Sequence, residues 1–137
     1  MRRSEIIAEA RKWLGTPFHH QGRVIGHGVD CYGVIEMVAR ALKVEVPEGL
    51  TYSRIPDEIQ LITYLDGYTL RVPLNEAREG DIIVIPFLKK MRHLAILTDK
   101  GMIHAYEPVG KVVEHAIDEK WRRMFRRAYA FPGMTHG

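Results

Sequence analysis

The chain has 137 residues, 46% hydrophobic and 27% charged, which is typical of a soluble globular protein, and we expect residues 1–137 to form a single domain. No apolar run approaches the roughly 20 residues that span a membrane, and the N-terminus lacks the apolar core of a signal peptide, which predicts synthesis in the cytoplasm and no membrane span. The net charge of +3 reflects one cluster of five cations at 120–127, whereas a nucleic-acid-binding protein would show a broad basic face.

Three segments in the first half have the apolar spacing of amphipathic helices. The first covers 4–14, where Ser4 is a favoured capping residue. A loop rich in glycine and histidine follows over 18–28, and the second helix is expected from about 31 to 42. The third helix is expected to end at Asp66-Gly67. Its predicted apolar stripe consists of Ile55, Ile59 and Ile62.

The second half of the chain changes to the pattern of short, buried strands separated by turns. The expected strands are 70–72, 82–87, 93–97, 102–106, 111–115 and 128–131. A helical turn is expected over 118–123. Helices in the first half and antiparallel strands in the second favour an α+β domain.

Cys31 is the only cysteine, which excludes an internal disulfide, and it stands where the second helix is expected to begin. Asp30 before it is a favoured N-cap residue. Free N–H groups and the macrodipole at a helix N-terminus stabilise negative charge, so we expect the pKa of the thiol to be lowered there. A thiolate at this position would be a nucleophile. The alternative is a buried structural thiol, which is the commoner role of a lone cysteine.

A cysteine nucleophile needs a base within hydrogen-bond reach and a group that orients the base. His93 begins one expected strand and His104 lies inside the next. A turn centred on 100–101 would place His104 opposite Leu97, about 13 Å along the strand from His93. Contact between the two rings then requires a bulge, a stagger or an earlier turn. Glu107 or a backbone carbonyl is the alternative orienting group.

Six stretches, spread along nearly the whole chain, match motifs of one protein family and occur in the same order as in that family. They are Gly15-Thr16-Pro17-Phe18-His19-His20-Gln21-Gly22, Val29-Asp30-Cys31-Tyr32-Gly33-Val34, Glu79-Gly80-Asp81-Ile82, His93-Leu94-Ala95-Ile96-Leu97, Met102-Ile103-His104-Ala105 and 121–133. The Asp-Cys-x-Gly and His-x-Ala-Ile motifs are weak singly and specific together. With them the chain resembles the NlpC family of papain-like cysteine peptidases, in the form found in phage tails and gene-transfer particles. The resemblance implies a papain-like α+β fold, with N-terminal helices packed on a small antiparallel sheet or half-barrel.

The same resemblance implies a thiol protease, a cysteine endopeptidase that needs no cofactor and hydrolyses stem peptides of bacterial peptidoglycan between γ-linked D-glutamate and a diamino acid. It implies that Cys31 is the nucleophile, His93 the base and His104 the group that orients His93. Asp30 matches an acid that in some members binds the free amine of the substrate. A cell-wall hydrolase of this type would be a virion component, with phage-tail or tail-tip proteins as partners and no nucleic-acid ligand.

Two residues depart from the family pattern. Phe18 stands where members usually carry a tyrosine whose hydroxyl helps to hold the oxyanion, and the loss of one such donor costs about 100- to 1,000-fold in rate. A backbone N–H would remain, and His20 is a candidate substitute. Tyr32 replaces a small serine and is expected to narrow the pocket. We expect Phe18, His20 and Tyr32 to contact the substrate. The alternative function is a catalytically weak or inactive tail-tip structural or adaptor protein with the same fold.

The sequence suggests two further interpretations. A zinc cluster would need four suitable ligands, but their spacing matches no zinc signature, and we predict no metal site. The candidate ligands are His19, His20, His27 and Cys31. The run 120–127 interleaves aromatic residues with arginine, as nucleic-acid-binding strips do, but a turn with inward aromatics and solvated arginines is favoured. Anionic wall polymers are a third candidate partner for the run. His115 and His136 are expected to be solvated.

Overall fold

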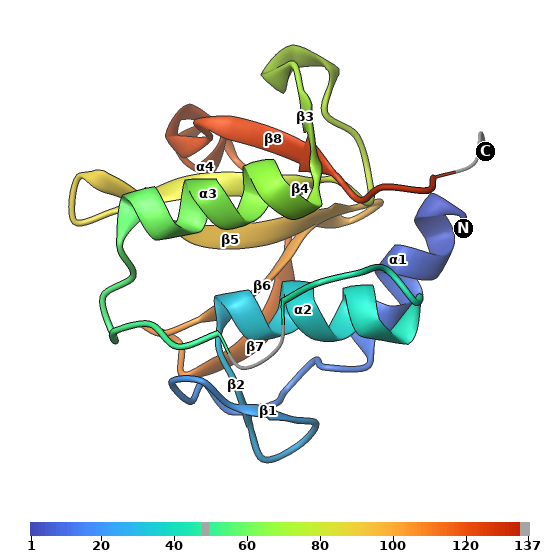
Figure 1. Cartoon of the computed structure of the whole chain (residues 1–137). Helices are drawn as coiled ribbons and strands as arrows, with labels where there is room; N and C mark the ends of the chain where they lie inside the picture. Colours follow the sequence, from blue (N-terminus) through green and yellow to red (C-terminus); the bar gives the residue numbers. More distant parts are fainter. Residues whose placement is uncertain (48–49, 135–137) are drawn as a thin grey trace.

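The computed structural model of the chain describes residues 1–47 and 50–134, so that His136 lies outside the described residues. The helices are α1 (Arg3–Arg11), α2 (Cys31–Ala41), α3 (Glu58–Tyr68), the 3-10 helix η1 (Leu74–Glu76) and α4 (Glu119–Met124). The strands are β1 (Arg23–Val24), β2 (Gly28–Val29), β3 (Leu70–Val72), β4 (Ile82–Phe87), β5 (Lys90–Thr98), β6 (Gly101–Tyr106), β7 (Lys111–His115) and β8 (Arg127–Ala130). Figure 1 shows these elements in chain order.

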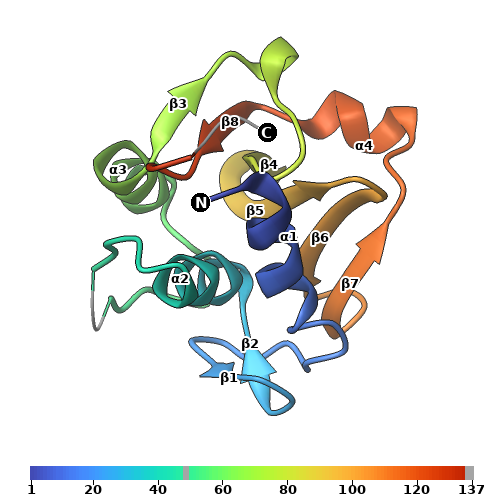
Figure 2. The ribbon, with the colours of Figure 1, turned by 90° about the vertical axis from the view of Figure 1, so that its right-hand side faces the viewer.

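Six strands form one antiparallel sheet in the order β3-β8-β4-β5-β6-β7. The strands β4 to β7 follow one another as neighbours, and β8 returns to lie between β3 and β4. Figure 2 shows the sheet curving from β3 and β8 round to β6 and β7, with α1 and α2 on one side and α4 on the other. The predicted α+β architecture, with N-terminal helices on a small antiparallel sheet, is therefore confirmed.

Side-chain alternation along the strands separates two apolar layers. On one face, Val34 and Val38 of α2 pack into a large core that includes Leu94 of β5. On the other face, Ala95 belongs to a smaller core that is covered by Trp121 of α4. Because α2 is buried along most of its length, the first residue of this helix is held rigidly against the sheet.

The helix α1 begins and ends earlier than its pattern predicts. Its first turn is closed by Glu5, whose carboxylate accepts a hydrogen bond from the backbone N–H of Arg2 at 3.2 Å. Ser4 therefore lies inside the helix and does not cap it. The helix ends at Arg11, three residues before its predicted end, and Leu14 at that predicted end is 44% exposed.

The stripe predicted for α3 is also wrong. Asp57 caps this helix by accepting a hydrogen bond from the backbone N–H of Ile59 at 2.7 Å, so Ile55 precedes the helix. Ile59 is 75% exposed. The helix continues through Gly67, and its buried residues are Leu61, Tyr64 and Leu65. The position of the cap, rather than the spacing of the isoleucines, decides which face of α3 meets the core.

Candidate active site

The N-terminus of α2 carries the predicted nucleophile, as expected from the sequence. Asp30 is the N-cap, and its Oδ1 accepts a hydrogen bond from the backbone N–H of Gly33 at 2.9 Å. Cys31 is the first residue of the helix and is 6% exposed. Its Sγ lies 4.0 Å from the carbonyl oxygen of Arg92, the residue that precedes His93 on β5. The thiol therefore lies against the strand that carries the predicted base.

Cys31 and His93 line the same cavity, which has a volume of about 330 Å³. Phe18, Arg54 and Trp121 are among its other walls. A larger hollow of about 650 Å³ lies beside α1, but the described residues that line it include neither cysteine nor histidine. The smaller cavity is therefore the candidate active site, because it alone of the two brings a nucleophile and a base together.

The pair His93 and His104 is in direct contact. Nε2 of His93 lies 2.6 Å from Nδ1 of His104. Thr98 pairs with Gly101, so the turn between β5 and β6 comes earlier than predicted and the register is shifted by two residues. The shift places His104 level with Ala95, on the same face as His93, and diagonal neighbours in a sheet are within reach of long side chains. The ladder between β4 and β5 also has an irregularity next to His93.

His115 extends this pair, and the prediction that it is solvated is wrong. Its Nε2 lies 2.9 Å from Nε2 of His104, and its Nδ1 lies 2.9 Å from the carbonyl oxygen of Ala116. The ring centroid of Trp121 lies 5.1 Å from that of His115. The residue was missed because its hydrogen-bond partner His104 lies on another strand, and because the packing of Trp121 beside it depends on how the chain turns between β7 and α4. The alternation of side chains along β7 could have placed His115 on the same face of the sheet as His104.

Burial controls the protonation of the site. It raises the pKa of the Cys31 thiol to about 12, with the charge of Asp30 as the second cause, and hydrogen bonds from the backbone of Leu94 and Tyr32 lower it less. The expectation that the helix N-terminus lowers this pKa is therefore wrong. Burial also lowers the pKa of His93 to about 4. Among the described residues, no hydrogen bond joins the thiol to the His93 ring, so the resting site holds a neutral thiol and a neutral base.

We expect the free energy of unfolding to fall as the pH is lowered from about 6.5 to about 4. The pKa of His93 is lowered from 6.5 to about 4, so in this window the unfolded chain binds a proton that the folded protein excludes. The contribution of the neutral His93 ring to the free energy of unfolding is complete above pH 6.5 and is lost as the pH falls towards 4. Thermal melts of the wild type and His93→Gln between pH 4 and 8 measure the effect. The variant should lose less stability over this range, and parallel curves would contradict the prediction.

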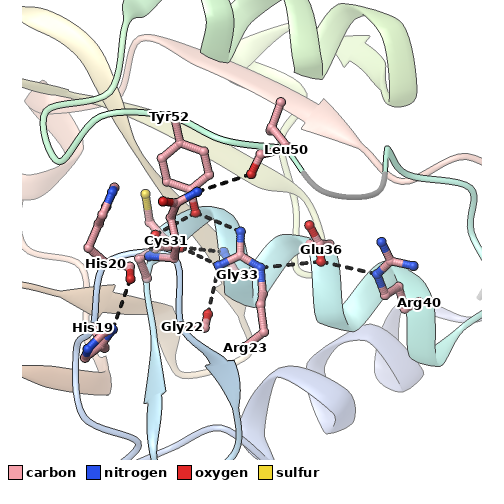
Figure 3. Close-up of polar contacts among 12 residues, drawn as sticks. His19, His20, Gly22, Arg23, Cys31, Gly33, Glu36, Arg40, Leu50 and Tyr52 are labelled. Carbon is pink, nitrogen blue, oxygen red and sulfur yellow. Dashed lines mark hydrogen bonds and ion pairs between the residues drawn. The ribbon is translucent and has the colours of Figure 1, made fainter.

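The N-cap Asp30 also belongs to a polar network, and Figure 3 labels its partners Arg23, Gly33 and Tyr52. Its Oδ1 accepts from Arg23 at 3.0 Å, and its Oδ2 accepts from the Tyr52 hydroxyl at 2.6 Å and from the backbone N–H of Gln21 at 2.7 Å. Arg23 also donates to Tyr52 at 2.7 Å and lies 3.4 Å from a carboxylate oxygen of Glu36. This network ties the loop before α2 and the connector after it to the helix. Neither Arg23 nor Tyr52 was expected in the site.

The predicted substrate contacts are divided between the cavity and its surroundings. Phe18 lines the cavity with Cys31. Tyr32 is 1% exposed, lies outside the cavity lining and stacks on Tyr52, with ring centroids 4.3 Å apart. His20 contacts Tyr52 edge-on, with centroids 5.4 Å apart, and is also absent from that lining. Asp30 lies next to the cavity with both carboxylate oxygens engaged, so a substrate amine would have to displace one of its present donors.

The other candidate ligand groups are not assembled. Within residues 1–47 and 50–134, no group of three or more His, Cys, Asp or Glu side chains is arranged to hold a metal ion. In the run 120–127, Trp121 and Phe125 pack against the smaller core while Arg122 and Arg123 are exposed, which confirms the prediction of an ordinary turn. Among the same described residues, no helix is both long and apolar enough to cross a membrane.

A cysteine at the start of a buried helix, beside hydrogen-bonded histidines on an antiparallel sheet, is the arrangement expected of a papain-like domain. The family described as "NlpC/P60 family" matches residues 15–129, and the chain belongs to this family. A comparison with curated proteins found no match.

Solved structures with this fold include the NlpC/p60 domain of the peptidoglycan hydrolase SagA, with 23% identity, a TM-score of 0.70 and coverage of 96% of this chain and 100% of that one. The peptidoglycan hydrolase RipB from Mycobacterium tuberculosis has 18% identity and a TM-score of 0.64, with 93% and 63% coverage. RipD from the same organism, described as a non-catalytic NlpC/p60 domain protein adapted to peptidoglycan binding, has 16% identity and a TM-score of 0.63, with 95% and 96% coverage. At these identities the likeness shows the fold alone.

Proposed function

We propose that this chain is a cysteine endopeptidase that hydrolyses the stem peptides of bacterial peptidoglycan. The observation that carries the proposal is the shared cavity of the Cys31 thiol and the His93 ring, with His104 hydrogen-bonded behind His93. Membership of the NlpC/P60 family supports the class of reaction. The substrate class is supported by SagA and RipB, which are both described as peptidoglycan hydrolases.

In this mechanism His93 acts as a general base on a neutral thiol. It takes the proton of Cys31 as Sγ attacks the carbonyl carbon, so that an S–C bond forms and the carbonyl oxygen becomes an oxyanion. Collapse of this intermediate breaks the C–N bond, and the protonated His93 gives its proton to the leaving amine. Water then attacks the thioester while His93 accepts a proton from it. The S–C bond breaks, the acid product leaves, and the proton returns to Cys31.

The oxyanion needs a hydrogen-bond donor, and Phe18 supplies none. We assign this role to the backbone N–H of Cys31, because the first N–H groups of a helix have no partner within the helix. A site with fewer donors than its relatives is expected to turn over slowly. His20 is the other candidate donor, and its ring would have to leave the edge of Tyr52 to reach the cavity.

For the scissile bond we propose the link between γ-D-glutamate and a diamino acid. A γ-linked glutamate keeps a free α-carboxylate, and the cavity that holds Cys31 is also lined by Arg54 and Arg92, whose guanidinium groups suit a carboxylate. We also propose that the protein works as part of a phage tail, with tail or tail-tip proteins as partners. The resemblance of the sequence motifs to the phage-tail form of the family supports this location.

Digestion of purified peptidoglycan tests the proposed function. Wild-type protein should release soluble peptide fragments, and mass spectrometry should find products that end in D-glutamate or begin with the diamino acid. Cys31→Ala, checked for folding by circular dichroism, should release none. Equal release by the two proteins would remove the peptidase assignment, because the reaction would not need the thiol.

A second candidate function is peptidoglycan binding without hydrolysis, in a tail-tip structural or adaptor protein. The observation that favours it is Phe18, which lies in the cavity where a hydroxyl donor is expected. RipD, which is described as non-catalytic, shares the fold. Co-sedimentation of the wild type with insoluble peptidoglycan, without release of fragments, would favour this function over the peptidase.

A further inference from the structure

Three histidine rings on three neighbouring strands form a continuous row of hydrogen bonds behind the cavity. Nε2 of His93 on β5 lies 2.6 Å from Nδ1 of His104 on β6. Nε2 of His104 lies 2.9 Å from Nε2 of His115 on β7. Nδ1 of His115 lies 2.9 Å from the carbonyl oxygen of Ala116. The row therefore ends on an atom that can only accept a hydrogen bond.

When the three rings are neutral, this row permits one arrangement of protons. A neutral imidazole has one N–H and one unprotonated nitrogen. The Ala116 carbonyl requires the proton of His115 on Nδ1, so Nε2 of His115 accepts and His104 donates from Nε2. Nδ1 of His104 then accepts, and His93 donates from Nε2. The unprotonated nitrogen of His93 is consequently Nδ1, which the row does not use.

The surroundings keep His93 and His104 neutral and hold their rings in place. Burial is the main cause that holds the pKa of His104 far below its ordinary value, and burial also lowers the pKa of His93. The ring of Trp121 stands edge-on to His104, with centroids 5.4 Å apart. Tyr106 stacks on His104, with centroids 4.8 Å apart, and also contacts the Trp121 ring at 5.5 Å. A ring flip in the row would have to displace these closely packed aromatic groups.

We propose that His115 is a positioning residue, which acts through His104 to hold His93 in the tautomer whose Nδ1 can accept the thiol proton. This inference rests on the proposed peptidase function, in which His93 is the base. The Ala116 carbonyl takes the part that a carboxylate plays in other triads, because it selects the tautomer at the far end of the row. His104 alone does not select it, since a neutral imidazole can either donate or accept at Nδ1.

Two substitutions of His115 separate its hydrogen bonds from its packing. His115→Phe keeps an aromatic ring beside Trp121 but removes the acceptor. His115→Gln keeps an acceptor for His104 and a donor for the Ala116 carbonyl. His27→Phe is the matched control, because His27 is exposed in the turn between β1 and β2.

Nuclear magnetic resonance reads the tautomers without any need for activity. Two-bond correlations between ring protons and nitrogens should show His93 and His104 protonated on Nε2 and His115 protonated on Nδ1 in the wild type. In His115→Phe, His93 should become a mixture of tautomers, and His115→Gln should keep the wild-type pattern. If His93 stays wholly in the Nε2–H form in His115→Phe, the inference is wrong, whether or not the protein proves to be a peptidase.

Kinetics of peptide release test the consequence for catalysis. His115→Phe should lower kcat about 10- to 100-fold and change KM less than about threefold, because His115 is not among the described residues that line the cavity. His115→Gln should recover most of this loss, and His27→Phe should match the wild type. A loss in His115→Phe that His115→Gln does not recover would show a packing role and would overturn the proposal. Absence of release by the wild type would instead contradict the peptidase function, and the tautomer measurement would still decide the role of His115.

Discussion

His93→Ala is expected to lower the rate of peptide release by about 10³-fold, near the middle of the range for a general base. The large effect follows from the resting state of the nucleophile. Burial raises the pKa of the Cys31 thiol to about 12, so almost no thiolate exists at neutral pH unless a neighbouring group accepts the proton. His93 lines the same cavity, and its ring stays unprotonated down to a pH of about 4, so that it is free to accept a proton over the neutral range.

Peptide release by His93→Ala, Cys31→Ala and the double variant measures this dependence. The double variant should be no slower than Cys31→Ala alone, because the two side chains act as one unit. Alkylation of Cys31 by iodoacetamide gives an independent reading, since the native thiol should react slowly near pH 8 and faster as the pH approaches 12. A His93→Ala rate within tenfold of the wild type, or a thiol that reacts fully below pH 8, would contradict the neutral-pair mechanism.

Local patterns predict those parts of the fold that local interactions decide. The strands β4 and β7 and the start of α2 lie where the sequence places them, because alternation or helical spacing is unbroken there. The position of Cys31 follows from the cap formed by Asp30, which is also a local contact. The prediction of the apolar stripe of α3 is wrong for a reason that is also local, since the cap at Asp57 makes the helix begin after Ile55.

The geometry of the site depends on contacts that the sequence leaves open. A difference of two residues in the turn between β5 and β6 decides whether His93 and His104 meet. The position of α4 decides whether His115 is solvated or packed beside Trp121. The pKa of Cys31 is decided by burial, which outweighs the helix N-terminus, and burial depends on the whole tertiary structure. Residue types therefore indicate which side chains are candidates for catalysis, while the fold sets the protonation states of those side chains.

Asp30→Ala is expected to lower the free energy of unfolding by about 3–5 kcal/mol, the usual cost of breaking a buried ion pair from one side. Asp30 is 4% exposed and accepts hydrogen bonds from Arg23, Tyr52 and the backbone N–H groups of Gln21 and Gly33. Removal of the carboxylate leaves these donors without their acceptor at a site that water reaches poorly. Urea unfolding of the wild type and the variant, with equal m-values, measures the loss.

Asp57→Ala is the matched control, because Asp57 also caps a helix through its carboxylate but is exposed. Its loss should cost about 1 kcal/mol, the usual value of an N-cap. Similar losses in the two variants would mean that Asp30 is only a cap and that its bonds to Arg23 and Tyr52 add little. The charge of Asp30 is also one cause of the raised pKa of the Cys31 thiol, so Asp30→Ala should speed alkylation of the folded protein even as it weakens the fold. Slower alkylation would show that the main effect of the Asp30 network on Cys31 is to position the thiol, and that the charge of Asp30 has the smaller effect on its ionisation.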